Sequence, residues 1–285
     1  RQLHHDTHQY SPDLRSFALT LHFFSPSAYN YVRNTFNKAL PHTSTIRKWY
    51  TSINGEPGFT QESLNAIRLK SKEMKQNGKQ LICGLLMDEM HIKENISYNN
   101  QRLQGYVNYG TGTNGNDGLP RATQALVYML VAINSCWKVP IAYFLINGIS
   151  SQEKSNLVNI CLSNVHEAGV IVKTLTFDGT SSNFSMATRI CLGANLSFSN
   201  LITFFQHPET KEKVHILLDA AHMLKLCRNT LGDWKTIYDR NDKAIQWKYF
   251  EELVSYQDRI GLHSGTKIRS RHISYHKENI KIFKN

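Results

Sequence analysis

The chain has 285 residues, of which 41% are hydrophobic and 19% are charged, an ordinary composition for a protein with a buried core. No apolar run approaches the roughly 18 residues that a membrane-spanning helix needs, so the sequence predicts no membrane segment. It has 33 Lys and Arg against 22 Asp and Glu, a formal net charge of +11. This excess favours a polyanionic partner, nucleic acid first, and a merely basic protein is the alternative interpretation.

The five cysteines are odd in number and lie in apolar segments, as reduced and buried cysteines do. No C-x-x-C pair is present, so we expect no zinc finger within this chain. These features predict an intracellular protein, and we expect it in the nucleus.

Three short amphipathic helices are predicted in residues 11–53, after a loose end at 1–10. Ser-Pro pairs mark the starts of the first two helices, and Pro41 ends the second before the third begins at Thr43 or Ser44. Three such helices with a tight turn between the last two are typical of a helix-turn-helix, whose final helix enters the major groove of DNA.

Arg47 and Lys48 lie away from the apolar face of the third helix and are candidate DNA-binding residues. A three-helix unit that binds nothing is the alternative. A linker is predicted at 54–58, where Gly and Pro cluster, and a polar, basic helix at 60–77.

In the stretch 81–91, a mostly apolar run is followed by two acids, Asp88 and Glu89, and this pattern predicts a buried central strand. Successive side chains of a strand point to opposite faces, so only one of the two acids faces a given site. We expect that acid to be Asp88, although a residue that merely ends the strand is the alternative interpretation.

Two further apolar runs, 170–178 and 214–219, also end in an aspartate, Asp178 and Asp219. We therefore expect an α/β fold in which strand-end carboxylates converge at one edge of a mixed sheet, where such folds bind ligands. Clustered carboxylates repel each other unless a hard cation such as Mg²⁺ or Mn²⁺ neutralises them. Two such ions about 3.5–4 Å apart would clamp the attacking and leaving oxygens of a phosphodiester.

Between the first two of these strands, the pattern predicts a strand at 102–109, a helix at 120–134 and a strand at 139–149. The segment 110–115 is a literal G-x-G-x-x-G, and a nucleotide-binding loop is one interpretation. We prefer a flexible loop beside the site, because Pro120 and not the glycines starts the following helix.

A helix is predicted directly after Asp219. His222, Lys225, Arg228 and Asn229 stand at i, i+3, i+6 and i+7 and share one face of it. A solvated basic face is one interpretation. We favour a helix that faces phosphates next to the metal site, because a histidine and an asparagine join the two cations.

The succession of motifs resembles P-element-type transposases, including the vertebrate THAP-domain relatives. The matching stretches are LPHTSTIRKWY, LLMDEMHIKENISYN, LQGYVNYG, ALVYMLVAINSCWKVPIAYFLI, LTFDGTSSN and LLDAAHMLKLCRNTLGD. The resemblance implies a helix-turn-helix followed by an RNase H-like domain that a GTP-binding insertion domain interrupts, with a DNA-binding zinc module ahead of both.

The resemblance also implies roles for the acids. Asp88 and Asp178 match the first two metal-binding aspartates of the family, and the third acid, a glutamate, is expected beyond Asn285. Asp219 matches a recurrent position at the border of the insertion and is a possible accessory acid. The implied activity is metal-dependent cleavage and strand transfer at transposon ends into target DNA, by a homo-oligomer, with GTP as a possible ligand. A domesticated DNA-binding protein without catalysis is the alternative.

These observations predict five regions in chain order. They are a loose N-terminus at 1–10, a helix-turn-helix at 11–58, a linker helix at 59–79, an RNase H-like domain at 80–233 and the start of an insertion domain at 234–285.

Overall fold

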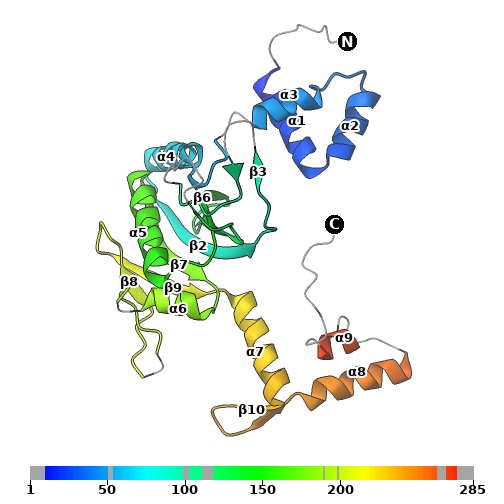
Figure 1. Cartoon of the computed structure of the whole chain (residues 1–285), viewed down its shortest axis with the longest axis vertical. Helices are drawn as coiled ribbons and strands as arrows, with labels where there is room; N and C mark the ends of the chain where they lie inside the picture. Colours follow the sequence, from blue (N-terminus) through cyan, green and yellow to red (C-terminus); the bar gives the residue numbers. More distant parts are fainter. Residues whose placement is uncertain are drawn as a thin grey trace. The chain divides into compact units, whose positions relative to one another are not determined.

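The structure of the chain is a computed structural model, and it describes residues 10–50, 54–98, 103–110, 118–188, 190–197, 199–261 and 268–274 (Figure 1). The chain divides into two compact units. The first comprises Arg1–Ser150 and Asn156–Lys173, and the second comprises Ser151–Ser155 and Thr174–Asn285.

The N-terminal part of the first unit is helical, as the sequence predicts. Helices α1 (Pro12–Phe24), α2 (Pro26–Thr35) and α3 (Thr43–Tyr50) follow one another. The hydroxyls of Ser11 and Ser25 accept hydrogen bonds from backbone N–H groups of the first turns of α1 and α2, so both Ser-Pro pairs are helix starts.

A small core of its own holds these helices together. Its buried members are Ala18, Tyr29, Leu40 and Ile46. The Tyr29 hydroxyl donates a hydrogen bond to the Pro41 carbonyl at 2.6 Å, which ties α2 to the turn before α3. Burial raises the pKa of Tyr29 to about 12, so the hydroxyl keeps the proton that this hydrogen bond requires.

Four neighbouring strands of the first unit pair antiparallel, and the beginning of a fifth follows them in the sheet. The strand order is β1 (Gly58–Phe59), β6 (Lys138–Ile146), β5 (Gln124–Ala132), β2 (Leu81–His91) and the beginning of β7 (Val170–Phe177). The pairs β1–β6, β6–β5 and β5–β2 are antiparallel. The predicted central strand with its acids is therefore present as β2, between β5 and β7.

The helix predicted at 120–134 is wrong, because this segment forms the strand β5. Its apolar residues occupy both faces: Leu126, Tyr128 and Leu130 are fully buried, and the residues between them are half-buried. A strand with a neighbour on each side and cover on both faces has a continuous apolar run, which periodicity does not separate from a buried helix.

The strand predicted at 102–109 is also largely wrong. Only β4 (Leu103–Gln104) forms there, paired with β3 (Ser97–Tyr98), and isolated bridges join Tyr106 to Arg121 and Asn108 to Leu145. Gly105 has a positive φ of 108°, and a Cβ there would lie 2.0 Å from the Asn95 carbonyl oxygen, so the chain bends at a position that only glycine fits.

Helix α4 (Gln61–Gln76) packs on this sheet, against β6 and β2 (Figure 1). It buries Leu64, Ile67 and Met74 on one face. The Ser71 hydroxyl donates to the Gly169 carbonyl at 2.6 Å, just after the end of α5 (Ser151–Glu167). This bond links the predicted linker helix to the segment that leads into β7.

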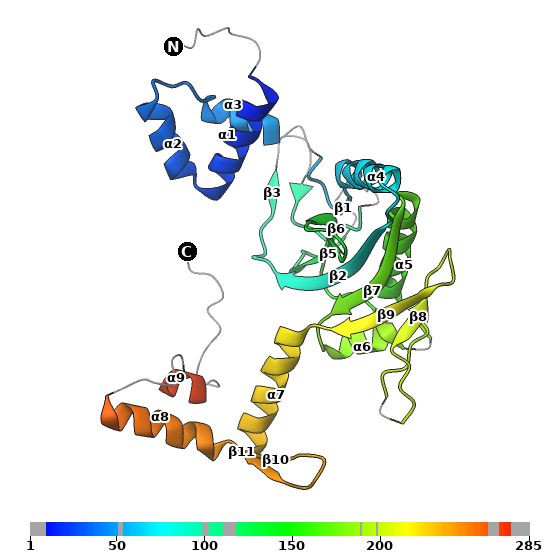
Figure 2. The same ribbon diagram turned by 180° about the vertical axis from the view of Figure 1, so that it is seen from behind.

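The second unit adds parallel pairing, so the predicted mixed sheet is confirmed. The end of β7 pairs parallel with β9 (Lys213–Leu218), and β9 pairs antiparallel with β8 (Phe204–Gln206). Helix α6 (Ser181–Ala187) follows β7, and α7 (Ala220–Trp234) follows β9 directly (Figure 2).

After α7, the described residues of the second unit form a hairpin and two helices. Strand β10 (Thr236–Tyr238) pairs with β11 (Ala244–Gln246), and α8 (Lys248–Ile260) and α9 (Ser270–Ile273) come after it. Among the helices of the described residues, none combines the length and the hydrophobicity needed to cross a membrane.

The cysteines are all free, but the prediction that all are buried is wrong. Cys83 and Cys161 are buried, whereas Cys136 and Cys227 are exposed and Cys191 is intermediate. Burial raises the pKa of Cys83 to about 12, so this thiol is protonated and unreactive at neutral pH.

Candidate functional site

Two of the strand-end acids lie at one edge of the sheet in the second unit. Phe177 of β7 is in register with Leu218 of β9, and the two strands are parallel. Asp178 and Asp219 directly follow this pair, and the Asp219 N–H donates to the Phe177 carbonyl at 2.9 Å. Parallel pairing therefore delivers both carboxylates to the same end of their strands.

The two oxygens of the Asp178 carboxylate have different surroundings. Oδ1 accepts hydrogen bonds from the Thr180 N–H at 3.2 Å and from the Asn183 side-chain amide at 2.7 Å. Oδ2 lies 3.8 Å from Nε2 of His222. The side chain of Asp178 keeps 18% of its surface exposed. One oxygen is thus fixed by N–H donors, and the other faces an imidazole and solvent.

Gly179 allows α7 to approach the end of β7. A Cβ at this position would lie 2.4 Å from the Met223 methyl carbon and 3.1 Å from a Leu226 methyl carbon, both on α7. A larger residue would force the ends of these two side chains to move. The small residue after Asp178 therefore lets His222 come close to the carboxylate.

Asp219 caps the helix that follows it. Its carboxylate oxygens accept hydrogen bonds from the N–H groups of Ala221 and His222, both at 3.3 Å, and they balance the positive end of the α7 dipole. Asp219, the possible accessory acid, thus has a structural role: it fixes the start of the helix that carries His222.

We expect Asp219→Ala to lower the free energy of unfolding by about 1 kcal/mol, within a range of roughly 0.5–2 kcal/mol, because the two N–H groups lose their acceptor. Asp219→Asn is the matched control, since it keeps an oxygen acceptor at the cap and should lose much less. Urea unfolding followed by circular dichroism measures both. Equal stability of Asp219→Ala and the wild type would show that the cap contributes nothing.

Asp88 lies in the first unit, near the end of β2. Met87 is 3% exposed, Asp88 is exposed and Glu89 is half-buried, so the two acids point to opposite faces as predicted. Glu89 is in register with the fully buried Leu126, on the core-facing side. Oδ1 of Asp88 accepts the Glu89 N–H at 2.9 Å, and the carboxylate lies at the surface.

The oxygen donors at these positions suit a hard divalent cation, because Mg²⁺ and Mn²⁺ prefer carboxylate ligands. Within the part of the chain that the structure describes, no group of three or more His, Cys, Asp or Glu residues could hold a metal ion. The carboxylates of Asp88 and of Asp178 are each donors of this kind.

The candidate DNA-binding residues fall in two places. In α3, Arg47 and Lys48 are exposed next to Ile46, which is fully buried, so both cations point away from the helical core as predicted. In α7, Lys225 and Arg228 are exposed and border an apolar hollow of about 570 Å³. His222 of the same helix instead lies beside Asp178, with Nε2 3.8 Å from Oδ2.

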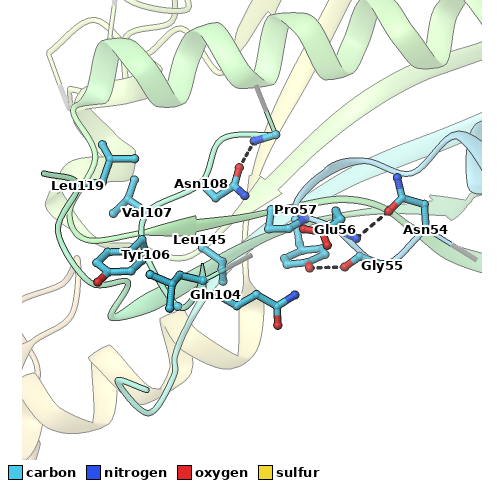
Figure 3. Close-up of a pocket in the computed structure, with 14 residues that line it drawn as sticks. Asn54, Gly55, Glu56, Pro57, Gln104, Tyr106, Val107, Asn108, Leu119 and Leu145 are labelled. Carbon is cyan, nitrogen blue, oxygen red and sulfur yellow. Dashed lines mark hydrogen bonds between the residues drawn. The ribbon is translucent and has the colours of Figure 1, made fainter. Parts of the chain in front are cut away.

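A second hollow, of about 460 Å³, lies in the first unit (Figure 3). The Tyr143 hydroxyl on its wall donates to the Gly55 carbonyl at 2.5 Å, and Oδ1 of Asn108 accepts the Gly110 N–H at 2.8 Å. Gly110 has a positive φ and touches the backbone of Gly58. The remainder of the glycine-rich loop, 111–117, lies outside the described residues.

Sequence reasoning missed Asn183 as a site residue. Its side chain is 3% exposed, and its amide donates the shorter of the two hydrogen bonds that Oδ1 of Asp178 accepts. The only signal in the sequence is the run Gly-Thr-Ser-Ser-Asn after the strand, which predicts a helix start but no side-chain direction.

Three family models match the chain in succession. The HTH domain of transposable element P transposase-like proteins matches residues 1–49. The TNP-like RNase H N-terminal domain matches residues 55–191, and the TNP-like GTP-binding insertion domain matches residues 221–283.

Two known proteins are similar over most of the chain. DNA transposase THAP9 of Homo sapiens is 29% identical over 258 residues, which are 89% of this chain and 28% of the human protein. The solved Drosophila P element transposase strand transfer complex shares the fold with a TM-score of 0.67 at 20% identity, over 94% of this chain and 54% of that chain. The chain therefore spans 28% and 54% of the lengths of these two relatives.

The mixed sheet, its strand-end aspartates and the helical unit ahead of it define an RNase H-like α/β protein with an N-terminal helix-turn-helix. Three matched domains in the order of one known architecture narrow this class further. In all three regions the chain is similar to P-element-type transposases, among them a THAP-domain transposase.

Proposed function

We propose that this chain is the DNA-binding and catalytic-core part of a P-element-type DNA transposase, which cleaves phosphodiesters at transposon ends and transfers the strands to target DNA. The observation that carries the proposal is the Asp178 carboxylate at the end of β7. One of its oxygens is held by Thr180 and Asn183, and the other faces outward beside His222. A carboxylate fixed in this way is pre-oriented for a cation.

In this proposal Asp88 and Asp178 hold Mg²⁺ or Mn²⁺, and a third acid, a glutamate, comes from beyond Asn285. Two supports come from the fold: each acid lies at or near the end of its strand, and β2 and β7 are neighbours in the strand order. When bound there, such ions would supply the activation of water, and later of a DNA 3′-hydroxyl, for in-line attack on a phosphodiester. GTP is proposed as a ligand of the insertion domain.

Arg47 and Lys48 would hold DNA through its phosphates, and Lys225 and Arg228 would neutralise phosphates nearer the acids, with His222 beside Asp178. Exposed guanidinium and ammonium groups in a chain of net charge +11 support this part of the proposal. We further propose action in the nucleus, as a homo-oligomer, and the division into the five regions that the sequence predicts.

We expect the double variant Arg47→Ala/Lys48→Ala to bind DNA more weakly on every sequence and to reduce the slope of log affinity against log salt by about 2. The slope falls because each phosphate that the protein no longer neutralises keeps about one counterion that binding would otherwise release. Fluorescence anisotropy over a range of salt concentrations measures this slope. The control Lys72→Ala/Lys75→Ala makes the same change of charge on exposed residues of α4. Equal slopes for both variants would remove α3 from the DNA interface.

A DNA-binding protein without catalysis is the second candidate function. It is favoured by the exposed cations of α3 and the net charge of +11, which support DNA binding without any metal site. The two candidate functions predict different results for a protein that is as long as the relatives of this chain. Salt-dependent DNA binding without any Mn²⁺-dependent nicking or strand transfer would support the second candidate, whereas nicking that depends on Asp178 would support the first.

A further inference from the structure

The second unit contains a buried lysine, Lys154, in the first turn of α5. The residue is 1% exposed. Lysine is almost never fully buried unless its ammonium group has partners, because removing the charge from water costs several kcal/mol. A lysine in the first turn also opposes the positive end of the helix dipole. Burial and the helix dipole both disfavour a charged lysine at this position, which indicates that its ammonium group has a role.

The ammonium group of Lys154 contacts α6. It donates to the Ser182 hydroxyl at 2.9 Å and to Oδ1 of Asn183 at 3.0 Å. The Asn183 amide then donates through Nδ2 to Oδ1 of Asp178 at 2.7 Å. Lys154, Asn183 and Asp178 therefore form one hydrogen-bonded chain from a buried cation to the strand-end carboxylate.

The chemistry of the ammonium group fixes the direction of this chain. A lysine ammonium has three donors and no acceptor, so only the oxygen of the Asn183 amide can face it. The NH₂ end must then face the carboxylate, where it is a donor. With a neutral, apolar residue at 154, the amide would lose one of the two charged groups that orient it, and only the carboxylate would favour the NH₂ end.

We propose that Lys154 is a positioning residue, which acts through Asn183 to hold Oδ1 of Asp178 and to keep Oδ2 available for a divalent cation. This inference rests on the proposed function, because it assumes that Asp178 is a metal ligand. Removal of a partner that orients a ligand typically lowers metal affinity by about 10–100-fold. We expect an effect near the lower end, since the Thr180 N–H also holds Oδ1.

The test measures Mn²⁺ binding to this chain by electron paramagnetic resonance, which counts free Mn²⁺ and needs no activity. Lys154→Met, close in size and uncharged, should raise the dissociation constant about tenfold. Lys72→Met, on the exposed side of α4, is the matched control and should bind as the wild type does. Asn183→Ala should weaken binding by a similar factor, and Lys154→Met/Asn183→Ala by no more than either single variant, because both act through one contact.

Two results would separate this inference from the proposed function. If Asp178→Ala abolishes binding and a folded Lys154→Met binds as the wild type does, the inference fails and the proposed function stands. If Asp178→Ala binds Mn²⁺ as the wild type does, the proposed function fails, and the inference falls with it.

Lys154→Met removes a buried group, so thermal unfolding is used to check that this variant folds. If the variant does not fold, a measurement on the wild type tests the inference instead. In a Mg²⁺ titration followed by NMR, the Asn183 side-chain amide and the Lys154 ammonium signals should shift together. They should not shift in Asp178→Ala. An Asn183 amide signal that ignores Mg²⁺ in the wild type would overturn the role of Lys154.

Discussion

Replacing Asp178 by alanine should lower metal-dependent DNA cleavage by roughly a thousandfold in a protein that carries this chain at the length of its relatives. The reason is electrostatic. A metal ligand supplies several kcal/mol of stabilisation to the charge that develops in phosphodiester attack, and about 4 kcal/mol corresponds to three powers of ten in rate. Gel assays of Mn²⁺-dependent nicking on transposon-end DNA measure the loss.

The control for this variant is Asp233→Ala, which removes an exposed acid from the far end of α7 and should leave the rate within about twofold. Circular dichroism and DNA affinity show whether both proteins are folded. An Asp178→Ala protein that folds, binds DNA and keeps more than about a tenth of the wild-type rate would show that Asp178 is not a ligand in the reaction.

Leu126→Ala should lower the free energy of unfolding by about 2–5 kcal/mol, the largest effect on stability that we expect. Leu126 is fully buried in β5, which lies between β2 and β6, and it is in register with Glu89 of β2. Truncation removes apolar area and leaves a cavity that a close-packed sheet fills poorly. Urea unfolding followed by tryptophan fluorescence gives the difference.

Ile133→Ala is the matched control, because Ile133 follows β5 directly and is 58% exposed. It should cost no more than about 0.5 kcal/mol. Equal costs for the two variants would contradict the burial of β5.

The elements with local signals could be predicted from the sequence. Hydroxyl caps followed by proline start α1 and α2, since a cap needs only the residue itself and the N–H groups of the next turn. Apolar runs that end in Asp178 and Asp219 are strands, and their parallel pairing brings both acids to one edge. These features depend on residues that are close together in the sequence, so they can be predicted from it.

The strand β5 could not be separated from a helix by the same means. Its residues are apolar at nearly every position, because neighbours flank it on both sides and none of its residues is exposed on either face. A helix buried on all sides has the same composition. The choice is made by the pairing of Leu126 and Tyr128 with distant strands, which the local sequence does not contain.

The supports of the candidate site were hidden for a related reason. Lys154 and Asn183 are 29 positions apart, and they meet only because the first turn of α5 and α6 pack together in the second unit. The motif around Asp178 predicts the carboxylate. It contains no sign of the buried cation behind it.

The most direct test of the central claim is the anomalous scattering of Mn²⁺ in crystals of this protein. We expect a manganese peak about 2.1 Å from a carboxylate oxygen of Asp178, with Asp88 as a further ligand of the bound metal. Well-ordered crystals at saturating Mn²⁺ in which neither aspartate touches a manganese peak would contradict it.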